Sequence, residues 1–70
     1  MHRKIFVVEP TRTGWRIVSE GREMSRWHYA GPALERASRM ADAVHVRARR
    51  PTAVEIRYPS GDGILTELHG

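Results

Sequence analysis

One stretch of helical period, bounded by two prolines, restricts what this chain can fold into. Apolar residues recur in it at the spacing of a helix that packs one face on a core: Leu34, Ala37, Ala41, Val44 and Ala48. Pro32 suits the first helical position, where its missing N–H costs nothing. The residue before Pro51 resists helical geometry. The sequence therefore predicts one amphipathic helix over 31–50, with Met40 at the edge of its stripe.

Segments of strand character lie on both sides of this helix. Strands are predicted at 5–9, 15–19, 24–29, 53–58 and 64–68. The clearest period-two alternation is in 53–58, and the weakest is in 24–29, where Trp27 and Tyr29 would share a face. We expect a single α+β domain over residues 1–70, of order ββ(β)αββ. In it, one helix packs on one face of an antiparallel sheet of four to five strands.

A sheet covered by a single helix keeps one open face, and here that face is predicted to be partly apolar. Ile5 and Val7 lie opposite Phe6 and Val8 in the first strand, so both faces receive apolar side chains. A 70-residue chain buries only about 60% of its unfolded surface, and without cysteine it has no disulfide to compensate. Apolar patches often mark association surfaces. We expect a homodimer through the open face, with these contact residues: Ile5, Val7, Val18 and Leu65.

The positive charge is concentrated on the predicted helix. Residues 36–50 carry five arginines and one acid, a net +4, which leaves seven basic and seven acidic side chains elsewhere. With 100° between successive residues, four of these arginines fall within an arc of about 80°: Arg36, Arg39, Arg47 and Arg50. Such a ridge can follow a phosphate backbone, which makes DNA or RNA the first candidate partner. The alternatives are an ordinary solvated helix face and arginine enrichment that reflects genome composition.

The aromatic residues allow two interpretations. Trp27 and Tyr29, with Arg26 beside them, are the residue types on which single-stranded nucleic acids stack their bases. A domain this small also needs its aromatics inside, since each buries roughly 150–250 Å². We favour a place in the core or in the dimer interface.

Neither a metal site nor a catalytic motif emerges from the spacing. No two of His2, His28, His45 and His69 lie three or four residues apart, the serines lie in no nucleophile elbow, and the acids are scattered. A chain of this size has little room for a ligand cleft of about 300 Å³ or more. We expect a protein that is not an enzyme and that takes no metal, cofactor or small-molecule ligand.

The N-terminal apolar run is only four residues long, well short of a signal-peptide core of roughly 7–15. No run reaches the about 20 apolar residues of a membrane span. We therefore expect a cytoplasmic protein without membrane contact.

The order of motifs resembles a family of short bacterial proteins of unknown function. The similarity rests on four short motifs: Val7-Val8, Gly14-Trp15-Arg16-Ile17, the Ala-rich stretch from Glu35 to Ala41, and Val54-Glu55-Ile56 followed by Asp62-Gly63-Ile64. A Thr or Ser often opens the helix in that family, whereas Gly31-Pro32 does so here. The resemblance implies a small α+β fold without catalytic residues, and it carries no activity or site.

Overall fold

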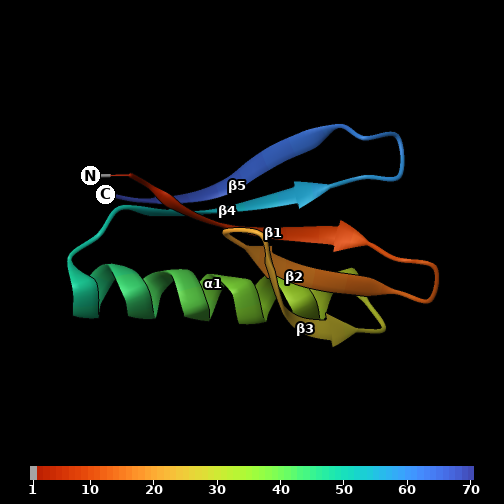
Figure 1. Cartoon of the computed structure of the whole chain (residues 1–70), viewed down its shortest axis with the longest axis horizontal. Coiled ribbons are helices and arrows are strands. Elements are labelled where there is room, and N and C mark those ends of the chain that lie inside the picture. Colours follow the sequence, from red (N-terminus) through yellow and green to blue (C-terminus); the bar gives the residue numbers. More distant parts are fainter. Residues whose placement is uncertain (1) are drawn as a thin grey trace.

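The computed structural model describes residues 2–70, which form five strands and one helix in the order βββαββ (Figure 1). The elements are β1 (Lys4–Pro10), β2 (Trp15–Ser19), β3 (Arg22–Trp27), α1 (Ala30–Ala48), β4 (Thr52–Arg57) and β5 (Gly63–His69). The predicted α+β class and the single helix on one face are confirmed.

The strands form one five-stranded sheet in the order β3-β2-β1-β4-β5. The pairs β1–β2, β2–β3 and β4–β5 are antiparallel, whereas β1 and β4 are parallel, with Phe6 opposite Val54 and Val8 opposite Ile56. The predicted purely antiparallel sheet is therefore wrong, and the sheet is mixed.

The parallel pairing of β1 with β4 follows from the direction in which α1 leads the chain back across the sheet. Strands β1, β2 and β3 alternate in direction, and α1 then runs back along the sheet, so β4 sets out in the direction of β1 and β3 (Figure 1). The only strand that could accept β4 as an antiparallel neighbour is β2, and both of its sides are already occupied. The new strand must therefore join one edge in parallel, and it joins β1.

The core lies between α1 and the sheet face that α1 covers. Its fully buried members come from β1, β2, β4 and one line of small helix residues: Phe6, Val8, Ile17, Val54, Ala33, Ala37 and Ala41. Alanine side chains let the helix approach the sheet closely. Of the predicted stripe, Ala37 and Ala41 are buried and Leu34 and Val44 are half-buried, but Ala48 is exposed in the last helical turn.

The helix ends two residues before the predicted boundary. Arg49 has a φ of 51°, the left-handed conformation that commonly follows a helix. Arg50 consequently lies outside α1, in the connection to β4. The prediction of four arginines on one helical arc is wrong for this residue.

The third strand lies earlier in the chain than predicted. Glu20 and Gly21 both have positive φ values, 51° and 78°, as in a two-residue hairpin turn of type I′. Because this turn is so short, β3 already begins at Arg22 and ends at Trp27. Tyr29 takes the N-cap position of α1 instead of sharing a strand face with Trp27.

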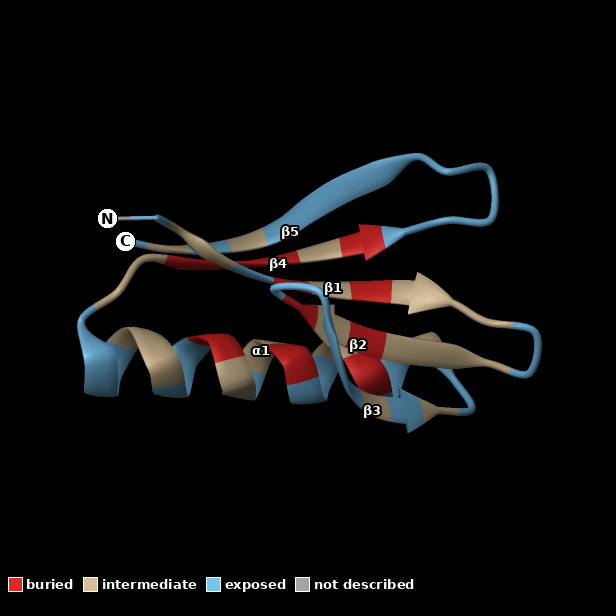
Figure 2. Cartoon of the chain, in the orientation of Figure 1, coloured by how far each residue is buried: buried red, intermediate tan, exposed pale blue. Residues whose placement is uncertain are grey.

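Strand β5 lies at the outer edge of the sheet, and most of its residues are exposed (Figure 2). It is held by its pairing with β4 and by a few polar contacts. At one end, Arg3 donates hydrogen bonds to the carbonyl oxygens of Thr52 and Gly70, at 2.8 and 2.9 Å. These bonds hold the beginning and the end of the described chain together.

Candidate nucleic-acid interface

Three of the four predicted arginines lie together on the solvent side of α1. Arg36, Arg39 and Arg47 are exposed, and none of them has an acidic or hydrogen-bonding partner among residues 2–70. A rise of 1.5 Å per residue places Arg36 and Arg47 about 16 Å apart along the helix. We call these three residues the helix ridge.

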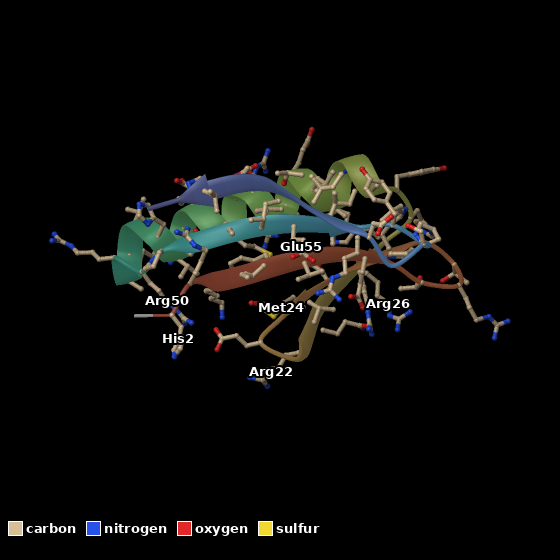
Figure 3. All side chains as sticks on the ribbon, turned by 90° about the horizontal axis from the view of Figure 1, so that it is seen from above. His2, Arg22, Met24, Arg26, Arg50 and Glu55 are labelled. Atoms are coloured by element: carbon tan, nitrogen blue, oxygen red, sulfur yellow. The ribbon has the colours of Figure 1, made fainter. Side chains whose placement is uncertain are left out.

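Arg50 is directed elsewhere. Its Nε donates to the carbonyl oxygen of His2 at 3.0 Å, and its Nη1 lies 3.2 Å from a carboxylate oxygen of Glu20. Figure 3 shows Arg50 beside His2, at the opposite end of the molecule from Arg26. The structure thus brings three of the predicted binding arginines together and leaves the fourth tied to the β2–β3 turn.

Most cations of the sheet have acidic partners. The ion pairs join Lys4 and Arg50 to Glu20, Arg16 to Glu9 and Glu23, Arg26 to Glu23, and Arg57 to Glu55. Within the described chain, six arginine side chains take part in no ion pair or hydrogen bond, and four of them are in or directly after α1: Arg12, Arg22, Arg36, Arg39, Arg47 and Arg49. Arginines without a described partner are therefore concentrated along the helix, where they outnumber its two carboxylates, Glu35 and Asp42.

The ion pairs favour the charged form of their carboxylates. The hydrogen bond from Lys4 and the charges of Lys4 and Arg50 lower the pKa of Glu20. The hydrogen bond from Arg26 is the main cause that lowers the pKa of Glu23. These groups stay ionised at neutral pH, so the acids of the sheet remain engaged with their own cations.

The four residues predicted for a dimer interface all lie on the sheet face that α1 leaves uncovered. Val7 pairs with Val18 across β1 and β2, and Ile5 is opposite Ala53 on β4. Leu65 and Leu68 share this face because the register shift in β5 places them opposite Glu55 and Ala53. Exposed fractions of 36% for Ile5, 52% for Leu65 and 61% for Leu68 make this an accessible apolar surface. We call it the open-face stripe: Ile5, Val7, Val18, Leu65 and Leu68.

A polar cluster joins α1 to β5, and its members are too far apart in the sequence for spacing to reveal it. Ser38 Oγ donates to Glu67 Oε1 at 2.9 Å, and His69 Nε2 lies 2.8 Å from the same oxygen. The rings of His69 and His45 are 5.9 Å apart between centroids. Hydrogen bonds from His69 and from Ser38 lower the pKa of Glu67.

This cluster is not arranged as a catalytic triad. In a triad the histidine lies between the nucleophile and the acid, whereas here Glu67 lies between Ser38 and His69. A carboxylate with a lowered pKa is also a weak general base. No group of three or more histidine or carboxylate side chains suited to a metal ion occurs in the part of the chain that the structure describes.

The aromatic residues divide between the core and the surface. Phe6 is buried, and Trp15 and Trp27 pack half-buried against the core. Tyr29 and Tyr58 are exposed, at 74% and 42%. Of the two places expected for the aromatics, the core takes three of the five, and the dimer interface stays a prediction.

Over residues 2–70, no helix is both long enough and apolar enough to cross a membrane. Comparison with protein-family models, with curated proteins and with solved structures finds no match. The resemblance to the short bacterial family accordingly remains an expectation, and any function has to be argued from the residues of this chain.

Proposed function

We propose that this protein binds nucleic acid through its phosphates, with the helix ridge of Arg36, Arg39 and Arg47 as the contact surface. The observation that carries the proposal is the distribution of partners: the sheet pairs most of its cations internally, whereas the ridge arginines have no described partner. Guanidinium groups bind phosphate oxygens in bidentate geometry, and a free guanidinium gives up no internal ion pair to do so.

Binding of this kind depends steeply on salt. Three phosphate contacts to a duplex give a slope of about −2.7 in log K against log salt, so raising salt from about 50 to about 200 mM weakens binding about 40-fold. Fluorescence anisotropy of a labelled duplex over this range measures the slope directly. A slope near zero, or no binding of either this duplex or the corresponding single strand at about 50 mM salt, would reject the proposal.

Charge reversal locates the contact. The double variant Arg36→Glu/Arg47→Glu removes two contacts and lowers the magnitude of the slope by about 2. A matched control is Arg12→Glu/Arg22→Glu, which changes the net charge equally at exposed, unpartnered residues outside α1. The control is expected to weaken binding while leaving the slope unchanged. If the two double variants behave alike, only net charge attracts the polyanion and the ridge is not the site.

A second function, a homodimeric interaction module, has its own supporting observation in the open-face stripe. Five apolar side chains lie on an uncovered sheet face, and the charged residues of that face are paired among themselves, as in Arg16 with Glu9 and Arg57 with Glu55. A face with internally neutralised charge can be buried against a copy of itself at a smaller desolvation cost than one with free charges.

Sedimentation velocity over a range of protein concentrations tests this second function. Val18→Asp, on the stripe, is expected to dissociate the dimer. Val46→Asp, the same change on α1 at a residue that is 64% exposed, is expected to leave it intact. A wild-type protein that remains monomeric at the highest concentration would contradict the dimer.

A further inference from the structure

A hollow of about 290 Å³ lies between the end of β3 and the first half of α1. It is lined by Trp27, Pro32, Glu35, Arg36 and Arg39, and we call it the Trp27 hollow. Two of these residues belong to the helix ridge, so the hollow adjoins the proposed phosphate contacts. With two guanidinium groups and one carboxylate, its lining carries a net charge of +1.

The lining offers a different kind of contact to each part of a nucleotide. Trp27 supplies an aromatic surface for stacking, and its Nε1 is already satisfied by a 2.8 Å hydrogen bond to Ser25 Oγ, which fixes the orientation of the indole. Arg36 and Arg39 supply guanidinium groups for phosphate. Glu35 supplies a carboxylate that can accept a hydrogen bond from an exocyclic amine of a base.

The size of the hollow favours a part of a larger ligand. Pockets for complete small molecules occupy about 300–1,000 Å³, so about 290 Å³ is at the lower limit of that range. A second hollow of about 230 Å³ shares Trp27 and reaches the β1–β2 loop through Thr11 and Thr13. In Figure 1 this loop, the end of β3 and the start of α1 lie at the same end of the molecule. The volume of the Trp27 hollow by itself therefore suits one unit of a polymer.

Another hollow, of about 440 Å³, is less suited to an anionic ligand. Its lining includes two carboxylates, Glu35 and Glu67, against the single guanidinium of Arg39. The Trp27 hollow has the opposite balance, which favours it as the place where a phosphate and a base are held together.

We propose that the Trp27 hollow binds an unpaired nucleotide of a single-stranded nucleic acid, with its base against Trp27 and the adjoining phosphates on Arg36 and Arg39. The inference rests on the proposed function, since it assigns a strand form to the same ridge. Bases in a duplex are stacked and paired, and they cannot enter a lateral hollow without being extruded. The site therefore selects single strands over duplexes.

Three fluorescent probes of equal length separate the inference from the proposed function: a mixed-sequence DNA single strand, the same strand with abasic central positions, and the duplex. Stacking of one base contributes about 1–3 kcal/mol, so the intact strand is expected to bind at least about fivefold tighter than the abasic strand. No binding of any probe rejects both proposals. Equal binding of the intact and abasic strands rejects the base site and leaves the phosphate ridge standing.

Two pairs of charge reversals give a positional control. Arg36→Glu/Arg39→Glu is expected to abolish the preference for the intact strand over the abasic one. Arg47→Glu/Arg49→Glu makes the same charge change at the other end of α1. This variant is expected to retain the preference for the intact strand while its affinity for both strands falls. If both variants retain the preference, the Trp27 hollow is not where the base binds.

Trp27 itself is better observed than removed, because its replacement would remove its packing against the core and the proposed stacking surface together. Trp15 and Trp27 are the two tryptophans of the chain, so Trp15→Phe leaves Trp27 as the sole indole fluorophore. The intact strand is expected to quench this emission at saturation, and the abasic strand is not. Equal quenching by both strands, or by neither, contradicts stacking on Trp27.

Discussion

Gly14 gives the sharpest test of the close approach between the start of β2 and the end of β3, because only a residue without a side chain fits there. A Cβ atom built on Gly14 would overlap the carbonyl oxygen of Trp27 and would lie 3.2 Å from the Cα atom of His28. Both neighbours are backbone atoms, which cannot turn aside as a flexible side chain can. Gly14→Ala therefore has to push the start of β2 away from the end of β3.

The expected loss of stability on this substitution follows from the measured effect of overpacking in other proteins. Forcing an extra carbon into a packed site costs about 1–3 kcal/mol, and we expect about 2 kcal/mol for Gly14→Ala because backbone atoms must move. In a domain of this size, 1 kcal/mol shifts the melting temperature by roughly 4–8 °C. The variant is therefore expected to melt about 8–16 °C below the wild type.

Gly31 provides the matched control in the same chain. It lies in the first turn of α1, and a Cβ atom built there meets nothing within 4 Å. Since alanine is favoured over glycine by up to about 1 kcal/mol in helices, Gly31→Ala is expected to leave the melting temperature unchanged or raise it by a few degrees. Thermal unfolding followed by circular dichroism measures both variants under identical conditions. A Gly14→Ala protein that melts at or above the wild-type temperature would refute the close approach of the two strands.

Two further predictions concern buried and paired polar groups. The buried hydroxyl of Thr52 donates to the carbonyl oxygen of Ala41 at 2.9 Å, so Thr52→Val should lower the free energy of unfolding by about 1 kcal/mol; an unchanged urea midpoint, at an unchanged m value, would contradict this. Hydrogen bonds from His69 and then Ser38 lower the folded-state pKa of Glu67. The contribution of this carboxylate to the free energy of unfolding is therefore complete above its ordinary pKa of 4.5 and is lost as the pH falls through the lower folded value. The difference in melting temperature between the wild type and Glu67→Gln should therefore shrink from about pH 5.5 towards about pH 3. A difference that stays constant or grows would show that these hydrogen bonds do not stabilise the charged carboxylate.

Local features of the fold could be predicted because they are encoded over short distances. The positions of Ala37 and Ala41 in a helical stripe and the alternation around Val54 and Ile56 need only neighbouring residues to be recognised. The same alternation predicted that Ile5 and Phe6 point to opposite faces of the sheet, and the structure places Phe6 in the core and Ile5 on the uncovered face. The ends of two elements differ from the prediction because of local backbone conformations. The tight turn at 20–21 makes β3 begin earlier than predicted, and the left-handed conformation of Arg49 ends α1 before the predicted boundary.

The candidate site depended more on tertiary structure. The sequence placed Arg36, Arg39 and Arg47 on one side of a helix, but it contained no sign that Arg50 would pair with Glu20, 30 positions away. The Trp27 hollow likewise needed β3 and α1 to be set side by side. Such contacts join residues that no periodicity relates.

By itself, then, the sequence determined one amphipathic helix with arginines along one side of it, the strand segments around it, and the two-sided apolar character of β1. Only the tertiary structure decided that β4 pairs in parallel with β1, which arginines keep their charge unpartnered, and where Trp27 meets the helix. The physical reason is that helix and strand periods arise from the geometry of adjacent residues. Strand order and ion pairing arise instead from which distant segments the folded chain brings into contact, as when Ser38 meets Glu67 and Lys4 meets Glu20.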